Sequence, residues 1–237
     1  MLFYYFCSML YAIVVAGGSG SRMQSATPKQ FLPLLGKPVM VHAINTFLQY
    51  DQSMSVIVVL PENEQDRESE ILMHVSDPNR VQFTTGGRSR FQSVKNGLKC
   101  LNKEGIVFVH DAVRPMIDQS LLHRCYNLAV QKGSAIPVIP CKDSIRQITD
   151  AGSLSLNRSQ LRLVQTPQTF QLSIIQQAFQ LEEDVQFTDE ASVVEQSGTE
   201  VFICDGMETN IKITTPTDLK MVEWLMQSSI DSTHPQN

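Results

Sequence analysis

The sequence lacks the features that mark nucleic-acid-binding proteins and disulfide-stapled domains. Its 237 residues carry a formal net charge of −5, which argues against a broad basic surface for nucleic acid, so any anion site has to be local. The five cysteines are scattered and form no Cys-x-x-Cys pair, which indicates reduced thiols of a cytoplasmic protein rather than a metal site. The hydrophobic share of 42% is nevertheless sufficient for a substantial core.

Long apolar runs are also missing. Residues 1–16 are apolar and uncharged, but they are shorter than the roughly 20 residues of a membrane span. They also lack the positively charged start of a secretory signal. We therefore expect a first core strand at 11–16 and disordered tails at 1–8 and 228–237. No repeat, low-complexity tract or linker divides the rest, so a single domain is predicted over residues 9–227.

Strands and helices alternate along the first half of the chain. Apolar runs of strand length occur at 55–60, 81–85, 106–109 and 135–139. Helices are expected after Pro38, over 62–75, over 89–101, and from a cap at Asp118 or Ser120 to Lys132. This alternation predicts an α/β fold with a mostly parallel sheet and helices on both faces. Such sheets bind ligands at the carboxyl ends of their strands, where Gly17, Gly86, Asp111 and Pro140 fall.

Residues 143–163 interrupt this alternation. Polar and apolar residues alternate with period two at 144–149 and 153–157, around a turn at 150–152, which predicts a hairpin that leaves the sheet. A lone two-stranded hairpin is marginal in water, so we expect this β-arm to pack on another surface, most simply a second copy of the chain. Further on, the pattern predicts helices at 172–180, 189–196 and 216–227 and short strands at 200–203 and 210–213.

A glycine-rich loop follows the first strand. The glycines of residues 17–20 can bring bare backbone amides close to an anion, and Arg22 and Lys29 add positive charge beside them. No Gly-Lys-Ser/Thr follows as in a P-loop, and Met23 stands where a dinucleotide fingerprint has its third glycine. The loop therefore indicates a triphosphate site of another kind, and the alternative is an ordinary glycine turn.

Two further strand ends carry polar motifs. Gly-Gly-Arg-Ser-Arg-Phe-Gln-Ser-Val at 86–94 opens a helix, and its glycine pair can lie against a base and a ribose. His110 and Asp111 are typical of a nucleophilic triad, but no Gly-x-Ser-x-Gly elbow precedes them, so we do not assign one. The alternatives are a surface glycine turn at the first motif and a salt-bridged strand end at the second.

Several motifs together resemble a known family. Residues 16–23, 28–32 and 36–39 (AGGSGSRM, PKQFL and GKPV) are similar to the GT-A-like nucleotidyltransferases. The Pro-Lys-Gln-Phe form is most similar to the 2-C-methyl-D-erythritol 4-phosphate cytidylyltransferase family of the non-mevalonate isoprenoid pathway. The motifs at 86–94, 110–115, 166–168, 188–191 and 210–214 extend the resemblance over nearly the whole chain.

The resemblance implies a Rossmann-like fold with a projecting β-arm. It implies transfer of CMP from CTP to 2-C-methyl-D-erythritol 4-phosphate with release of pyrophosphate, and Mg²⁺ held mainly by the CTP phosphates, with no protein metal ligand. It also implies a homodimer in which the arm crosses to the neighbouring subunit. The alternatives are a ribitol-5-phosphate cytidylyltransferase, another sugar-phosphate nucleotidyltransferase, and a non-catalytic nucleotide-binding module.

The same resemblance implies the site residues, in three groups. The catalytic residues are Arg22, Lys29, Arg158 and Lys212. The nucleotide-binding residues are Ala16, Gly17, Gly18, Ser19, Gly20, Gly86, Gly87, Ser93, Asp111 and Ala112. The residues for the polyol phosphate are Asp111, Arg114, Ser144, Arg158, Thr166, Thr188 and Lys212. Since the substrate phosphate attacks the α-phosphorus directly, no nucleophilic side chain is expected.

Overall fold

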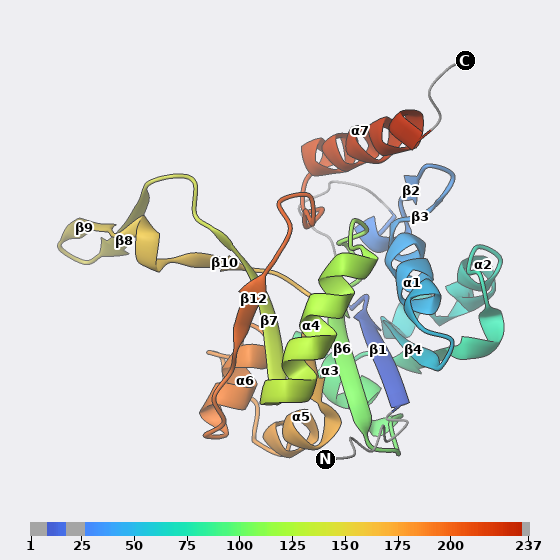
Figure 1. Cartoon of the computed structure of the whole chain (residues 1–237), viewed down its shortest axis with the longest axis horizontal. Helices are drawn as coiled ribbons and strands as arrows, with labels where there is room; N and C mark the ends of the chain where they lie inside the picture. The colour runs from blue at the N-terminus through green and yellow to red at the C-terminus, as the bar shows by residue number, and fades with distance from the viewer. Residues whose placement is uncertain (1–8, 18–26, 234–237) are drawn as a thin grey trace, which may run out of the picture.

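The computed structural model describes residues 9–17 and 27–233, which form a central sheet, flanking helices and a projecting arm (Figure 1). The main sheet has the strand order β10-β7-β11-β6-β1-β4-β5, and β12 also pairs with β7. These strands are β1 (Met9–Val15), β4 (Met54–Leu60), β5 (Val81–Thr85), β6 (Gly105–Asp111), β7 (Ser134–Pro140), β10 (Arg162–Val164), β11 (Gln168–Gln171) and β12 (Ile203–Asp205).

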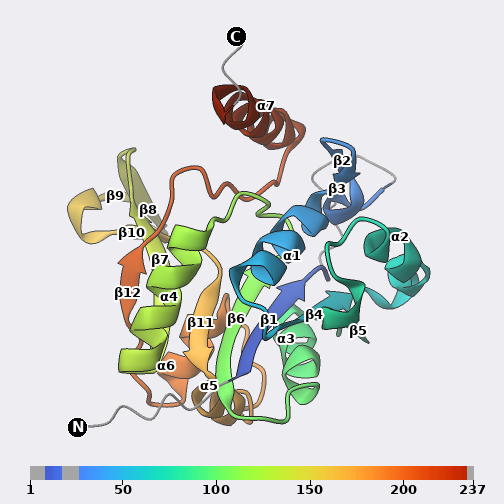
Figure 2. The same ribbon diagram turned by 45° about the vertical axis from the view of Figure 1, so that its right-hand side comes forward.

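The sheet is mixed but mostly parallel. Strand β1 is parallel to both β4 and β6, β5 is parallel to β4, and β12 is parallel to β7. Strand β11 lies antiparallel between β6 and β7 (Figure 2). The predicted α/β fold is confirmed, but β11 is absent from the sequence prediction. Its sequence Gln-Thr-Phe-Gln has only Phe170 as an apolar residue, so no strand pattern stands out.

Helices cover both faces of the sheet, and alternate strand residues supply the two cores. Leu10, Ala12 and Val14 of β1 pack toward one face, and Tyr11 and Ile13 pack toward the other. Because both sets are buried, the strand reads as a continuous apolar run. The first face is covered by α1 (Val39–Tyr50) and α4 (Gln119–Lys132), and the second by α3 (Arg90–Lys99), α5 (Leu172–Ala178) and α6 (Glu190–Gln196).

Two smaller features complete the body. The short hairpin of β2 (Pro33–Leu34) and β3 (Lys37–Pro38) contributes to a third apolar cluster with Val113, Ile213 and Val222. Val222 belongs to α7 (Pro216–Thr233), so this cluster joins the last helix to the loop after β6. No helix within residues 9–17 and 27–233 has both the length and the apolar composition to cross a bilayer.

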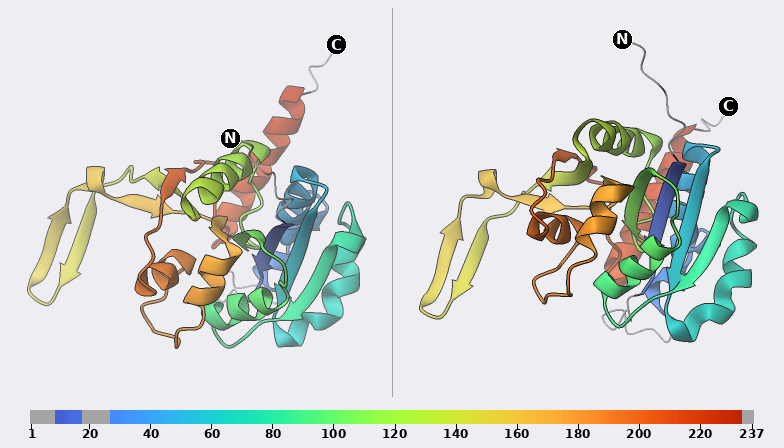
Figure 3. Two further views of the ribbon diagram at one scale, coloured as in Figure 1. Left: turned by 60° about the horizontal axis from the view of Figure 1, so that its bottom comes forward. Right: turned by 90° about the horizontal axis from the view of Figure 1, so that it is seen from below.

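The predicted arm is confirmed as a hairpin. Strands β8 (Ile145–Thr149) and β9 (Gly152–Leu156) pair antiparallel, and they extend away from the body in both views of Figure 3. The 3-10 helix η5 (Arg158–Gln160) leads back to β10. Ile148 is 80% exposed and Leu154 is 59% exposed, so the arm presents apolar surface that this chain does not cover.

Four local predictions were inaccurate. The helix over 62–75 is instead the 3-10 helix η3 (Glu62–Arg67) followed by α2 (Glu68–Leu72), and η3 is itself kinked at Glu64, which has φ −125° and ψ 16°. The strand at 200–203 lies slightly later, as β12, after the turn at Gly198. The prediction of a strand at 210–213 is wrong, because this segment is irregular. Helix α7 extends past 227 into residues expected to be a tail, while 1–8 and 234–237 lie outside the described residues.

Helix α3 approaches the sheet closely at Gly97. A Cβ atom there would lie 2.7 Å from Cγ2 of Ile13 and 3.2 Å from Cγ2 of Val59, both in buried β-branched side chains. We predict that Gly97→Val lowers the free energy of unfolding by roughly 1–3 kcal/mol, because overpacking outweighs the ~1 kcal/mol that replacing a helical glycine returns. Urea unfolding measures this.

The matched control is Lys99→Val, which places the same side chain on the exposed face of α3. It should cost less than about 1 kcal/mol, the range of helix propensities. Equal urea midpoints for the two variants would show that the α3–sheet contact is not as close as described.

Candidate active site

The Pro-Lys-Gln-Phe motif is anchored to the end of the first strand. Gln30 is buried, and its Nε2 donates to the carbonyl of Ala16 over 2.6 Å. The 3-10 helix η2 (Lys29–Phe31) is thereby held at the carboxyl end of β1, and Lys29 with it. The structure thus places the segment that carries Lys29 beside the end of β1. The predicted residues Gly18, Ser19, Gly20 and Arg22 lie outside the described residues.

Ser93 joins this turn to the glycine turn after β5. A Cβ atom would lie 3.1 Å from Ser93 Oγ at Gly17 and 3.0 Å from it at Gly86, so a side chain at either position would crowd the Ser93 hydroxyl. The Ser93 hydroxyl donates to the carbonyl of Ser89 and accepts from the N–H of Gly87. Ser93 therefore lies between the two turns and is hydrogen-bonded to the second, and its contact with a nucleotide stays a prediction.

Asp111, the last residue of β6, is the centre of a charged cluster. Its Oδ2 lies 2.9 Å from Nζ of Lys212 and 3.4 Å from Nε of Arg114, and its Oδ1 lies 3.2 Å from Nη2 of Arg90. Burial alone would raise the pKa of this carboxyl group, but the charges of Arg90, Lys212 and Arg114 outweigh burial and hold the pKa well below its usual range. Asp111 is therefore ionised throughout the neutral range.

The backbone around Asp111 is fixed by His110 and Thr166. Nε2 of His110 donates to the carbonyl of Arg114 over 2.9 Å, since a carbonyl oxygen can only accept. Nδ1 of the neutral ring therefore accepts from the Thr166 hydroxyl, which itself accepts from the Asp111 N–H over 3.0 Å. Burial lowers the pKa of His110 to about 4, so the imidazole is neutral at pH 7. His110 thus has a structural task, since both of its ring nitrogens are occupied by Thr166 and the carbonyl of Arg114.

Lys212 reaches Asp111 from an irregular segment rather than from a strand. Buried Asn210 donates to the carbonyl of Thr166 over 2.8 Å and accepts at its own carbonyl from Nη1 of Arg114 over 2.7 Å. On the other side of Lys212, the N–H of Ile213 donates to the carbonyl of Val113. These bonds to the loop after β6 replace a sheet ladder and hold Lys212 over the strand end.

Two residues of the cluster are absent from the sequence prediction. Glu190 is 1% exposed and pairs with Arg90 through both carboxylate oxygens, with Oε2 lying 3.0 Å from Nη2. Both residues fall inside motifs noted above, but a charged residue in the first turn of a helix is usually solvated. Asp189 is the N-cap of helix α6 and accepts from the N–H of Ser192 over 2.9 Å.

A cleft opens over this cluster. Its walls include Arg90, Asp111, Arg114, Thr166, Thr188 and Lys212, so the structure gathers five of the predicted residues at one place. Thr188 is exposed at this cleft, whereas Thr166 is buried beneath it. Within residues 9–17 and 27–233, no group of three or more His, Cys, Asp or Glu side chains is arranged to hold a metal ion.

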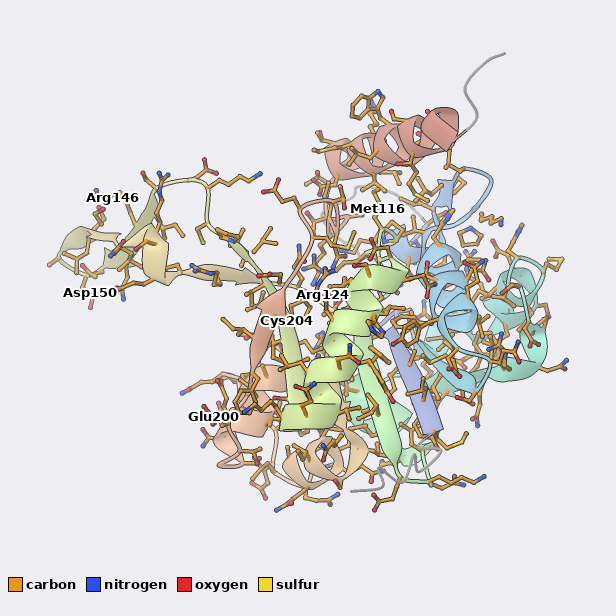
Figure 4. The ribbon with its side chains drawn as sticks, in the orientation of Figure 1. Met116, Arg124, Arg146, Asp150, Glu200 and Cys204 are labelled. Carbon is orange, nitrogen blue, oxygen red and sulfur yellow. The ribbon has the colours of Figure 1, made fainter. Side chains whose placement is uncertain are left out.

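The arm residues lie apart from this cleft. Arg158 is exposed and donates to the carbonyl of Lys142, and Ser144 is exposed at the start of the arm. Figure 4 shows Arg146 and Asp150 on the hairpin, well away from Met116 in the loop after β6. In the described part of the chain, no hydrogen bond or ion pair links Ser144 or Arg158 to the Asp111 cluster. One chain alone therefore does not bring all predicted residues together.

The Asp111 cluster should contribute to the free energy of unfolding, and this contribution should depend on pH. Asp111→Asn leaves Arg114 and Lys212 without their counter-ion and Arg90 with Glu190 alone, which should lower the free energy of unfolding by about 3 kcal/mol or more. Since the pKa of Asp111 is lowered by folding, its contribution is complete above the unfolded pKa and is lost as pH falls below it.

Urea midpoints of the variant and the wild type, measured from pH 8 to pH 3, check this. Their difference should stay constant down to about pH 4 and narrow below it. A difference that already narrows between pH 7 and pH 5 would contradict a strongly ionised Asp111.

Comparison with known proteins identifies the family. The family model described as IspD, 2-C-methyl-D-erythritol 4-phosphate cytidylyltransferase, matches residues 10–228. Two proteins with that enzyme name are similar. The one from Bacteroides thetaiotaomicron is 46% identical over 211 residues, covering 88% of this chain and 95% of its own length. The one from Geobacillus kaustophilus is 39% identical over 220 residues, covering 92% and 96%.

Solved structures agree with the sequence comparison. The 4-diphosphocytidyl-2C-methyl-D-erythritol synthase from Anaerococcus prevotii superposes with a TM-score of 0.79 at 26% identity, covering 93% of this chain and 96% of that one. The 2-C-methyl-D-erythritol 4-phosphate cytidylyltransferase from Thermus thermophilus superposes with a TM-score of 0.71, also at 26% identity, covering 91% and 98%. The chain therefore belongs to the 2-C-methyl-D-erythritol 4-phosphate cytidylyltransferase family.

Proposed function

We propose that this chain transfers CMP from CTP to 2-C-methyl-D-erythritol 4-phosphate and releases pyrophosphate. The observation that carries the proposal is the family match over residues 10–228, together with a charged cleft at the carboxyl end of β6. A ribitol-5-phosphate cytidylyltransferase is not favoured, because relatives at 39–46% identity over most of the chain bear the methylerythritol name. A sensor is not favoured either, since it has no need of a site for a second phosphate.

The reaction joins two anions, so its main requirement is positive charge in fixed positions. The phosphate of the polyol attacks the α-phosphorus of CTP, and pyrophosphate leaves with additional negative charge. Lys29, held at the end of β1, and Arg22 stabilise the leaving group. Lys212 and Arg158 hold the attacking phosphate. Preorganised charge of this kind is the largest single contribution in many enzymes.

Asp111 organises the acceptor side of the site. It holds Lys212 by an ion pair, and the Lys212 side chain is still 41% exposed, so the ammonium group can contact a phosphate without leaving Asp111. Arg114 and Thr188 line the same cleft and supply donors to the polyol phosphate. Thr166 lies beneath the cleft and fixes the backbone of Asp111 by accepting a hydrogen bond from its N–H.

The remaining parts of the site come from outside the described chain. Mg²⁺ enters bound to the CTP phosphates, where it offsets their charge. The arm of a second subunit supplies Ser144 and Arg158. Packing of the arm against the other subunit also covers the apolar residues of the hairpin. The cysteines 100, 125, 141 and 204 are free thiols, which supports a cytoplasmic location for such a dimer.

The direct test is pyrophosphate release by the purified protein with Mg²⁺, CTP and a panel of polyol phosphates. We predict turnover with 2-C-methyl-D-erythritol 4-phosphate and a much lower kcat/KM with ribitol 5-phosphate. CTP should be favoured over UTP, because a site that hydrogen-bonds the cytosine amino group leaves buried groups unpaired with uracil. Turnover that prefers ribitol 5-phosphate, or that accepts both nucleotides equally, contradicts the proposal.

Lys29→Ala should lower kcat on the order of 10²–10³-fold, the usual cost of one preorganised charge at the reacting phosphates. The fold should be intact by circular dichroism. Lys99→Ala, which removes an exposed lysine from the end of α3, is the matched control and should retain wild-type turnover. Near-normal kcat for Lys29→Ala would exclude its assigned role.

The shared site is tested by mixing inactive subunits. Arg158→Ala and Lys29→Ala homodimers should each be nearly inactive, whereas exchanged heterodimers contain one site with both residues intact. Random exchange then restores about a quarter of wild-type activity, since half of the dimers are mixed and each has one intact site. Arg146→Ala, another exposed arm arginine, is the control and should be active alone. Mixtures that stay inactive, or an active monomer in sedimentation, contradict the shared site.

A further inference from the structure

Arg90 is shared unequally between two carboxylates. It contacts both oxygens of Glu190, through Nη1 to Oε1 and through Nη2 to Oε2, but only one oxygen of Asp111. Glu190 is 1% exposed, whereas the Arg90 side chain is 29% exposed on the wall of the cleft. The forked contact of a guanidinium with a carboxylate is the stronger arrangement, so Glu190 is the main partner of Arg90.

Glu190 is itself rigidly placed. It is the first residue of α6, and both neighbours are tied to Gln168 of β11. Gln168 donates to Oδ2 of Asp189 over 2.9 Å and accepts from the N–H of Ala191 over 2.8 Å. Since Gln168 pairs with Val109 in the sheet, the Glu190 carboxylate is positioned relative to β6, the strand that ends in Asp111. This contact belongs to the fold and needs no ligand.

The geometry leaves the second oxygen of Asp111 for Lys212. Oδ1 of Asp111 is paired with Nη2 of Arg90. Oδ2 lies 2.9 Å from Nζ of Lys212 and 3.4 Å from Nε of Arg114. If Glu190 were neutral, Arg90 would lose its forked partner and Asp111 would be the nearest carboxylate available to it. A forked contact between Arg90 and Asp111 uses both oxygens and displaces Lys212.

We propose that Glu190 is a positioning residue for the transfer reaction, which keeps Arg90 on a single oxygen of Asp111 and so leaves the other oxygen to orient Lys212. This inference rests on the proposed function, in which Lys212 holds the attacking phosphate. Burial of Glu190 raises the pKa of its carboxyl group, and the charge of Arg90 opposes that rise. Arg90 and Glu190 thus depend on one another, and the pair acts on substrate through Asp111 and Lys212.

The kinetic test is Glu190→Gln. It should lower kcat roughly ten- to a hundredfold, since a misplacement of about 1 Å at a reacting group costs up to that amount. The KM for the polyol phosphate should rise, and the KM for CTP should change little. The matched control is Glu195→Gln, which makes the same change on the exposed side of α6 and should retain wild-type kinetics. Kinetics for Glu190→Gln within twofold of wild type overturn the proposal.

A second measurement separates positioning from general loss of structure. Amine acylation followed by mass spectrometry reports how accessible Lys212 is, with exposed Lys220 as the internal reference. The ratio of Lys212 to Lys220 labelling should rise several-fold in Glu190→Gln, because Lys212 loses its ion pair, and stay unchanged in Glu195→Gln. A fall in kcat with an unchanged ratio means that Glu190 is merely structural, which overturns the proposal.

The double variant Arg90→Gln/Glu190→Gln removes the competing guanidinium together with the buried acid. Because it leaves no unpaired charge at this position, it should fold even if Glu190→Gln alone does not. Lys212 labelling should return to near the wild-type ratio, since Oδ2 of Asp111 is available again. A ratio that stays high contradicts competition by Arg90. Labelling needs no turnover, so this result is independent of whether CTP and methylerythritol phosphate are the substrates.

Discussion

The buried charge of Asp111 is the constraint on which the rest of the site depends. A carboxylate that is 7% exposed is stable only with counter-charges, and Arg90, Arg114 and Lys212 supply them from three different elements. Helix α3, the loop after β6 and the segment before α7 therefore have to meet at this one strand end. The same requirement leaves an exposed ammonium group in a cleft, which suits a phosphate.

The glycine turns follow from a different constraint, the close approach of neighbouring strand ends. Ser93 lies close to both Gly17 and Gly86, where a side chain at either position would crowd its hydroxyl group. Gln30 then holds Lys29 against the same strand end through the carbonyl of Ala16. One half of the site thus consists of the glycine turns with their exposed backbone, and the other half consists of the ion-paired side chains around Asp111. The two halves match the needs of a triphosphate and of a second, attacking phosphate.

Much of this was predictable from the sequence because it depends on local pattern. The strands that carry Gly17, Gly86 and Asp111 are apolar runs, and the glycines and motif residues mark their ends. Strand β11 was not predictable, since its pairing with β6 and β7 comes from tertiary contacts rather than from its own residues. Glu190 was missed for a related reason. From the sequence, Glu190 looks like a solvated residue in the first turn of a helix. Only the position of α6 in the fold shows that it is buried and paired with Arg90.

The central claim is that two phosphate-bearing substrates meet between Lys29 and the Asp111 cluster. A crystal structure of the protein with Mg²⁺, a non-hydrolysable CTP analogue and 2-C-methyl-D-erythritol 4-phosphate tests it most directly. The account predicts the triphosphate against the glycine turn and Lys29, and the polyol phosphate on Lys212 while Lys212 is still paired with Asp111. It also predicts Arg158 of a second subunit on that phosphate. A polyol phosphate bound away from Lys212, or a site completed within one chain, would contradict it.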